Sequence, residues 1–430
     1  MTRTLESLTT SDELPDATEV VIIGGGIVGV SAALTLAERG IPVVLLEKGR
    51  IAAEQSSRNL GWIRKTSRHA EDVPLALATD RLWEGMAERV GRDVGYRRCG
   101  IMFLAGGEPQ LALHEQWLES VNGLALDSRM LSSRDINTLV PGGKGQWVGG
   151  VYTPSDGKAE PHKATTAMAL AAIQQGARII QNCAVRSLQT SAGKVSGVVT
   201  EKGEIRCRSV LLAGGAWSRR FLGNMGINLP TLPLICSVLR TAPMEGPTDI
   251  SVGGPDFSFR KHEGGGFIIT QRGGLDAPIV LDHLLIGTRY LSQLKATLPV
   301  LRVKLGKPFV DDLKLARRWR ADQPSPFEQM RINNPPANPV LNAEAMANLC
   351  RAWPAFENAR IEEAWAGLID ITPDSIPVID HIGKIPGLTI ATGFSGHGFG
   401  TGPAAGHLAA DLVCGSQPIV DPAPYRFGRL

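Results

Sequence analysis

The chain has 430 residues, a hydrophobic fraction of 43%, a charged fraction of 20% and a formal net charge of +3 at pH 7. This length is too great for one simple core, so two domains or one discontinuous pair are expected, and the composition is that of an ordinary globular protein. Charges of both signs are interspersed, and no basic run is long enough to indicate a nucleic-acid partner.

The six cysteines are scattered without a CxxC pair, which favours reduced thiols over a disulfide framework or a zinc site, so no metal is expected. Residues 1–18 are polar and acidic, and no window reaches the roughly 18 apolar residues of a membrane-spanning helix. We therefore expect a cytoplasmic protein, and we leave open a peripheral contact with the inner membrane.

Residues 19–48 carry the strongest pattern of the chain: an apolar strand, three glycines, a helix, and a second apolar strand that ends at Glu47. Gly24 permits a tight turn, Gly26 lets a pyrophosphate approach bare backbone, and Gly29 allows the helix to pack closely on the strand. The helix N-terminus would face the phosphates, while the Glu47 carboxylate would bind a ribose diol and repel a 2′-phosphate. This spacing predicts a dinucleotide site.

Residues 54–62 place hydroxyl side chains beside an arginine and an asparagine, which suits a loop around phosphate and ring acceptors; a solvated surface loop is the equally weighted alternative. Apolar residues at helical spacing predict a packing helix over 75–90, and residues 100–105 are expected to form a strand that enters a second module. Residues 108–145 are expected to be helical and residues 149–161 to form a return loop.

An alanine-rich helix is expected from Pro161 to Gly176, and residues 177–215 predict successive strands with a β-meander in the middle. The last of these strands ends in two glycines, where backbone could approach a ligand. Residues 229–358 contain no nucleotide motif. Their alternating segments predict an antiparallel sheet, with helices over 281–305, and this region is the candidate substrate module.

The chain ends with a predicted strand, a glycine-rich turn and a helix that begins near Pro403. The turn reads GFSGHGFGTG, and it would give the protein a second helix N-terminus at the ligand. Backbone donors at such an end can face an anionic ring or a carboxylate.

Four motifs together resemble the D-amino-acid-oxidase-like family of FAD-dependent amine oxidoreductases, which includes sarcosine oxidases, D-amino-acid dehydrogenases and L-amino-acid deaminases. They are GGGIVG with Glu47, SSRN, LLAGGAWS and GFSGHGFGTGPA. A closer likeness is to bacterial L-amino-acid deaminases, and it is carried by LAERGIPVVLLEKGRIAAEQSSR, NCAVRSLQTSAGKVSGVVTEKGEI, TLPL, SPFEQMR and WPAFENARIEEAWAGLIDITPD.

The resemblance implies an α/β (α+β) class: a two-domain, glutathione-reductase-type FAD-binding fold with a discontinuous antiparallel-sheet substrate domain. The FAD-binding domain would comprise residues 1–90, 146–228 and 360–430. The substrate-binding domain would comprise residues 91–145 and 229–359.

Two departures leave the substrate open. The deaminases carry an N-terminal membrane anchor, for which this sequence shows no counterpart. The SGHGFG turn is closer to sarcosine oxidases, in which a lysine follows GHGF; Gly400 stands there in this chain, so we expect no carboxylate-binding lysine at that position.

By the resemblance, FAD is bound non-covalently, and covalent attachment through His69 is the less favoured alternative. The turn over 396–401 would surround the pyrimidine edge and stabilise the negative charge that develops at N1 and O2 on reduction. The expected cofactor-binding residues are Gly24, Gly26, Ile27, Val28, Gly29, Glu47, Lys48, Ser56, Ser57, Arg58, Asn59, Leu60, Gly61, Val185, Ala213, Gly214, Trp217, Gly367, Gly396, His397, Gly398, Phe399, Gly400 and Thr401.

For the substrate carboxylate we expect Arg272, whose segment aligns with the deaminase segment that supplies the carboxylate-binding arginine. Its planar guanidinium can hold a carboxylate bidentately. Arg240 and Arg260 are the alternatives. His397 would bind the ring or the substrate, or be structural, and Trp62 would wall the pocket or belong to the core.

The expected reaction is oxidative deamination: a hydride leaves Cα for flavin N5, and water hydrolyses the imino acid to an α-keto acid and ammonia. The alternative is an oxidase or dehydrogenase of secondary or cyclic amines of the sarcosine, hydroxyproline or D-amino acid type, acting alone or as one subunit of a complex. A flavin-binding scaffold subunit is the alternative outside enzymes. The acceptor, O2 or a membrane quinone, and the chirality of the substrate stay open.

Overall fold

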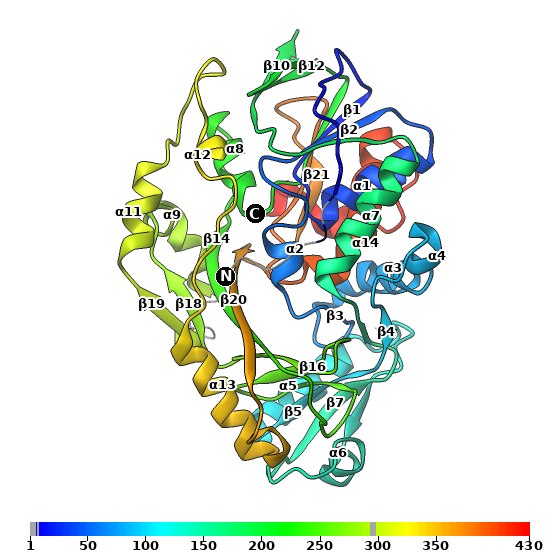
Figure 1. Ribbon diagram of the computed structural model, residues 1–430, viewed down its shortest axis with the longest axis vertical. Coiled ribbons are helices and arrows are strands. Elements are labelled where there is room, and N and C mark those ends of the chain that lie inside the picture. The colour runs from blue at the N-terminus through cyan, green and yellow to red at the C-terminus, as the bar shows by residue number, and fades with distance from the viewer. Residues whose placement is uncertain (1–5, 7, 293–297) are drawn as a thin grey trace.

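The structure is a computed structural model that describes residues 6, 8–292 and 298–430. Two sheets organise it. A six-stranded sheet with its helices forms one part of the molecule, and a larger mixed sheet forms the other (Figure 1). The α/β (α+β) class expected from the sequence is confirmed.

The six-stranded sheet has the order β21-β22-β13-β1-β2-β9, and it is parallel except where β21 pairs with β22. Its central strands are continuous apolar runs, as expected for strands that are covered on both faces. The strands are β1 (Val20–Ile23), β2 (Val43–Leu46), β9 (Arg178–Ile180), β13 (Ser209–Leu212), β21 (Val378–His381) and β22 (Leu388–Thr392).

Helices α1 (Ile27–Glu38), α7 (Pro161–Gln174) and α14 (Gly398–Cys414) lie together beside this sheet, with α1 in contact with both others (Figure 1). Residues 27–37 are all buried, because α1 is enclosed by the sheet and the two helices. A Cβ on Gly406 would stand 2.5 Å from the carbonyl oxygen of Val28, so this glycine lets α14 approach α1.

The last helix begins at Gly398 rather than near Pro403, so that prediction is wrong by five residues. Side chains of α3 (Val73–Glu84) satisfy backbone groups that the proline disturbs. The carbonyl of Gly400 accepts from Thr79 Oγ1 at 3.1 Å and from Trp83 Nε1 at 2.9 Å. The helix therefore continues through Pro403, and the glycine-rich turn itself forms its first turn.

The larger sheet has the order β19-β18-β14-β17-β16-β15-β5-β7-β6, with β20 on the free side of β14. Because β15 pairs with β5 in parallel, as β18 does with β19, this sheet is mixed rather than purely antiparallel. The strands are β5 (Ile101–Ala105), β6 (Arg129–Leu131), β7 (Gly149–Thr153), β14 (Leu232–Thr241), β15 (Ser251–Gly253), β16 (Ser258–Lys261), β17 (Phe267–Thr270), β18 (Leu275–Pro278), β19 (Leu301–Lys304) and β20 (Ile361–Ile371).

The return loop expected over 149–161 is wrong in its first half, because residues 149–153 form the buried strand β7 between β5 and β6. Its glycines suggested a turn, yet a Cβ on Gly150 would lie 2.5 Å from the carbonyl oxygen of Phe103. Close strand packing therefore requires glycine here. Strand β7 pairs within the larger sheet, so we propose that the substrate-binding domain includes it.

Helices were expected over 281–305, but β19 is a strand there, and residues 293–297 of that prediction lie outside the described residues. The loop over 54–62 contains a short helix, α2 (Gln55–Arg58), and the strand β3 (Trp62–Ile63). Strand β3 pairs with β8 (Gly157–Lys158), which also pairs with β4 (Arg97–Arg98).

The predicted β-meander is confirmed as β10 (Val185–Ser191), β11 (Lys194–Thr200) and β12 (Gly203–Arg206). No helix in the described part of the chain is long and apolar enough to cross a membrane. The remaining helices are α4 (Met86–Val90), α5 (Glu108–Ser120), α6 (Ser133–Leu139), α8 (Ser218–Asn224), α9 (Leu281–Ile286), α11 (Lys307–Lys314), α12 (Pro326–Gln329) and α13 (Pro339–Ala352).

Candidate active site

A cavity of about 490 Å³ runs from the strand ends of the six-stranded sheet to the face of the larger sheet. Its walls include the N-terminal ends of α1 and α14, the α2 segment, and residues of β14, β17 and β20. All but three of the residues expected to bind the cofactor line it. The exceptions are Gly29, Ser57 and Thr401.

These three residues do not line the cavity, but they stabilise its walls through close packing and hydrogen bonds. A Cβ on Gly29 would stand 2.1 Å from the carbonyl oxygen of Gly24, so this glycine permits close packing. Ser57 is buried and its hydroxyl donates to the carbonyl of Glu54 at 3.3 Å. The hydroxyl of Thr401 donates to the carbonyl of His397 at 3.0 Å and steadies the first turn of α14.

The glycine turn at β1 has the shape that a dinucleotide phosphate group requires. Gly24 has φ +115°, and a Cβ there would meet the carbonyl oxygen of Ala213 at 2.4 Å. A Cβ on Gly26 would meet only Ser56 Oγ, at 3.2 Å, so its other side is open to the cavity. Since α1 begins directly after Gly26, its N-terminal dipole favours an anion at this point.

Glu47 closes this end of the cavity. Its carboxylate accepts hydrogen bonds from the backbone N–H groups of Gly25 and Gly49, both at 2.7 Å. Burial raises the pKa of Glu47, while the charge of Lys48 opposes that rise. Lys48 itself pairs with Glu54 at 2.9 Å, so Glu47 is the carboxylate left to accept from a ribose diol.

The second glycine-rich turn forms a further part of the cavity wall. Ser395 and Gly396 have positive φ, 51° and 85°, which turns the chain so that Gly398 opens α14 at the cavity wall. A Cβ on Gly400 would stand 2.7 Å from the carbonyl oxygen of Trp62. A side chain at position 400 would fit only if the backbone at Trp62 moved. The backbone exposed here instead suits the edge of a flat ring.

Arg272, the expected carboxylate ligand, lines the cavity just after β17. Its side chain is exposed, but its exposed surface faces the cavity, and surrounding protein lowers its pKa to about 10 by desolvation. The guanidinium carbon lies 4.3 Å from the centre of the Phe103 ring, and Nη1 donates to the carbonyl of Gly254 at 3.3 Å. Among the described residues no carboxylate forms an ion pair with Arg272.

Arg64 is a cavity residue that the sequence reasoning missed. Its Nη2 lies 3.0 Å from His397 Nε2, it donates to the carbonyl of Thr66, and its guanidinium carbon lies 5.5 Å from the Phe103 ring centre. Desolvation, followed by repulsion from Arg68 and Arg272, lowers its pKa to about 9. Because side chains two residues apart on an extended chain share a face, Trp62 could have pointed to Arg64.

His397 is half-buried at the N-terminus of α14. Desolvation, together with the charges of Arg68 and Arg64, holds its pKa well below the usual value, so the imidazole is neutral. Since Arg64 can only donate, the contact makes His397 Nε2 the acceptor and leaves the ring proton on Nδ1. Trp62 walls the same end and meets Phe103 edge-on, with ring centres 5.6 Å apart.

The two alternative arginines lie elsewhere. Arg240 does not line the cavity and forms ion pairs with Glu362 at 3.1 Å and with Glu363 at 3.5 Å. Arg260 is fully buried, and its two terminal nitrogens donate to the two oxygens of Glu160 at 2.6 and 2.8 Å. Their guanidinium groups are therefore already engaged, and we leave both out of the proposed substrate pocket.

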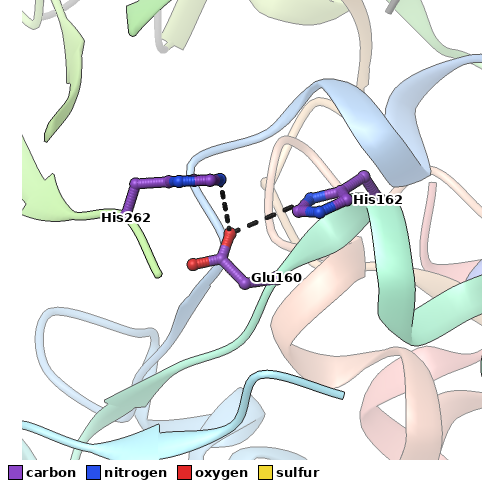
Figure 2. A group of neighbouring side chains, drawn as sticks. All are labelled: Glu160, His162 and His262. Atoms are coloured by element: carbon purple, nitrogen blue, oxygen red, sulfur yellow. Dashed lines mark ion pairs between the residues drawn. The ribbon is translucent and has the colours of Figure 1, made fainter. Parts of the chain in front are cut away.

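Figure 2 shows Glu160 between His262 and His162, at 3.5 and 4.0 Å respectively. These three side chains offer ligand atoms within 4.8 Å of one another, which is the spacing of a metal site. Arg260, however, binds both carboxylate oxygens. We interpret the cluster as an ion-pair network, in which desolvation lowers the pKa of His262 to about 4.

His69, the alternative point of covalent attachment, has an exposed side chain and does not line the cavity. This position does not favour a covalent bond to a group inside the cavity.

The family model for DAO, described as FAD dependent oxidoreductase, matches residues 19–412. The chain belongs to this family. It is an FAD-dependent enzyme of the amino acid oxidase and dehydrogenase type, as the sequence predicted, and the glycine cradle of α1, Glu47 and the turn at α14 fit the cofactor.

Among solved structures, L-amino acid deaminase from Proteus myxofaciens in complex with anthranilate is 34% identical with a TM-score of 0.95, covering 100% of this chain and 97% of that one. Glycine oxidase from Pseudomonas aeruginosa is 27% identical over 94% of this chain and 97% of its own length. Mitochondrial dimethylglycine dehydrogenase from Mus musculus is 26% identical over 99% of this chain. This chain spans only 46% of the dehydrogenase.

Proposed function

We propose that this protein catalyses the FAD-dependent oxidative deamination of an amino acid. The observation that carries the proposal is the guanidinium of Arg272, which lines the same cavity as the glycine-rich turn of α14 and has no carboxylate partner among the described residues. The similarity to the Proteus L-amino acid deaminase over the whole chain supports the same reaction class.

The cofactor would lie with its phosphates at α1 and its ring at α14. Bound FAD supplies the oxidising power, since it accepts the hydride that leaves Cα together with the electron pair of that bond. Glu47 would hold the ribose diol, and the backbone of residues 396–398 would face the ring edge. Arg272 would grip the carboxylate bidentately and so fix the direction of the Cα–H bond.

The charges at this end of the cavity also select the form of the substrate. Arg64 and Arg272 are cationic, with no ion-pair partner among the described residues, and His397 is neutral, so an ammonium group would be repelled. We propose that the amine enters uncharged, which leaves its lone pair available as the hydride departs. Water then adds to the imino acid and releases an α-keto acid and ammonia. O2 or a membrane quinone would reoxidise the cofactor.

The second candidate is the oxidation of a secondary or cyclic amine, acting alone or within a complex. The SGHGFG turn, which resembles that of sarcosine oxidases, favours this second hypothesis. The geometry of Gly400 weakens it, because the wall at Trp62 leaves no room for the lysine that the sarcosine oxidase pattern would place there.

Anaerobic bleaching of the FAD-loaded protein tests the proposal against a panel of L-, D- and N-alkyl amino acids. We expect rapid bleaching by primary amino acids, with the α-keto acid as product. Bleaching by N-alkyl or cyclic amino acids alone would transfer the assignment to the second candidate. A protein that retains FAD but is bleached by no amine would contradict both and indicate a missing partner subunit.

A further inference from the structure

The substrate end of the cavity holds a second unpaired guanidinium. Arg64 and Arg272 both lie over the ring of Phe103, with their guanidinium carbons 5.5 and 4.3 Å from its centre. The two carbons are therefore no more than about 10 Å apart, which one small molecule can bridge. They come from different parts of the chain, Arg64 from the segment after β3 and Arg272 from the end of β17.

Among the other cations that line the cavity, Arg58 is held by the backbone carbonyls of Asn333 and Ala53, Arg50 is exposed, and two have carboxylate partners. Lys48 pairs with Glu54 at 2.9 Å, and Arg68 pairs with Asp72 at 3.0 Å. Within the described residues, no carboxylate lies within ion-pair distance of Arg64 or Arg272. In the described part of the chain, Arg64 contacts the carbonyl of Thr66 and neutral His397, and Asp156 and Asp72 act on its charge only from beyond ion-pair distance. Arg272 contacts the carbonyl of Gly254 and the Phe103 ring.

The structure nevertheless makes room for this arrangement. A Cβ on Gly253 would stand 2.3 Å from Arg272 Nη1, so that glycine clears the space that the guanidinium occupies. Each arginine is desolvated, and Arg272 adds repulsion to Arg64, as their lowered pKa values reflect. Two like charges in a shared cavity are costly unless anions neutralise them on binding.

A mono-carboxylic amino acid whose amine is uncharged carries only one negative charge and would neutralise one of the two arginines. We propose that the substrate is an amino acid with a second carboxylate, the α-carboxylate binding Arg272 and the second carboxylate binding Arg64. This inference rests on the proposed function, and it names the substrate class of the same site. Arg64 is then the residue that determines specificity.

Matched substrate pairs test this directly on the FAD-loaded enzyme. Glutamate ends in a carboxylate where norvaline ends in a methyl group, and aspartate differs from 2-aminobutyrate in the same way. Both enantiomers of each amino acid are compared by anaerobic flavin reduction. We expect the acidic member of a pair to be preferred by about 100-fold in kcat/KM, the scale of a charge-assisted bidentate contact in a desolvated site.

The variant Arg64→Met should lower the ratio of kcat/KM for the acidic over the neutral member by a similar factor, mainly through KM. Arg64→Lys keeps the charge and should restore part of that ratio. Arg320→Met is the matched control, because its side chain is 76% exposed and pairs with Asp322 outside the cavity. It should leave the ratio unchanged.

Binding without turnover gives a second readout. Glutarate and pentanoate, which have equal chain lengths, are titrated into the FAD-loaded protein and followed by the change in flavin absorbance. We expect glutarate to bind about 100-fold more tightly than pentanoate, and Arg64→Met to remove most of that difference.

Efficient reduction by norvaline that equals or exceeds reduction by glutamate and aspartate would overturn this inference while leaving the proposed function intact. An equal loss for acidic and neutral substrates in Arg64→Met would also overturn it, since it would mean that Arg64 serves the cofactor or the shared α-carboxylate. If no amine at all reduces the flavin and glutarate binds no better than pentanoate, both proposals fail.

Discussion

The carbonyl oxygen of Trp62 occupies the space in which a side chain at position 400 would begin. A Cβ on Gly400 would stand 2.7 Å from this oxygen, and the Gly400 carbonyl is pinned by Thr79 and Trp83. Glycine inside a helix ordinarily costs about 0.5–1 kcal/mol relative to alanine. At position 400 the clash of an alanine Cβ with the Trp62 carbonyl outweighs the higher helix propensity of alanine, since overpacking costs about 1–3 kcal/mol.

Gly400→Ala should therefore lower the thermal midpoint of the FAD-loaded protein, despite the helix propensity of alanine. Gly223→Ala is the control, because Gly223 lies in α8 and a Cβ there meets no atom within 4 Å. That variant should be neutral or slightly more stable. A Gly400→Ala protein as stable as the wild type would show that the contact with Trp62 relaxes easily.

This contact also shows where sequence reasoning reached its limit. The glycine pattern around Gly24 and Gly26 has a local cause, so the phosphate end could be predicted from spacing alone. The pairing of Arg64 with His397 joins residues 333 positions apart, and no local pattern encodes it. The return loop over 149–161 was predicted wrongly for a related reason. Gly150 is required because the Phe103 backbone approaches it closely, but in the sequence such a glycine cannot be distinguished from a glycine of a turn.

Glu47→Gln should weaken FAD binding by about 10- to 100-fold, since hydrogen bonds to a charged group contribute about 1.5–3 kcal/mol. The carboxylate is fixed by the N–H groups of Gly25 and Gly49, and an amide cannot accept from both them and a diol as strongly. The measurement is a titration of the apoprotein by quenching of FAD fluorescence. Unchanged affinity would remove Glu47 from the ribose contact.

Arg272→Met should lower kcat/KM by on the order of 100-fold for acidic and neutral amino acids alike, because both would lose the α-carboxylate contact. The loss should appear chiefly in KM, and Arg272→Lys should recover part of it. This pattern differs from that expected for Arg64→Met, which changes the ratio between the two substrate classes. Unchanged kinetics would exclude Arg272 from the substrate site.

Asp370 gives the protein a pH-dependent stability. Burial raises the pKa of this cavity residue from 3.8 to about 6, although the N–H of Gly393 and the hydroxyl of Thr392 donate to it. The folded state then binds more protons than the unfolded state between about pH 4 and 6, so stability falls as pH rises through that window. The total is about 3 kcal/mol, at 1.36 kcal/mol per pKa unit.

Asp370→Asn should raise the thermal midpoint at pH 7 but not at pH 4, with the advantage growing between these values. The exposed carboxylate of Asp12, whose side chain is 93% exposed, supplies the control Asp12→Asn. Its weak, exposed ion pair with Lys202 at 3.9 Å contributes little, so that variant should change the midpoint only slightly at pH 4 and at pH 7. An Asp370→Asn protein whose advantage is independent of pH would contradict the raised pKa.

The buried pair of Arg260 and Glu160 should be more costly to break than to replace. Arg260 also donates to the carbonyl of Leu60, so the pair ties β16 to the segment that leads into the cavity. Removing the cation leaves a buried carboxylate without its partner, which costs about 3–5 kcal/mol, whereas an apolar pair of similar volume is often neutral. Arg260→Met should therefore lower the thermal midpoint strongly, and Arg260→Met with Glu160→Met should recover most of the loss.

The guanidinium also lowers the pKa of Glu160 to about 2, so the contribution of the pair is present above about pH 4.5 and is lost as pH falls towards 2. A double variant as unstable as Arg260→Met would mean that the contact of Arg260 with Leu60, and not charge compensation, stabilises this region.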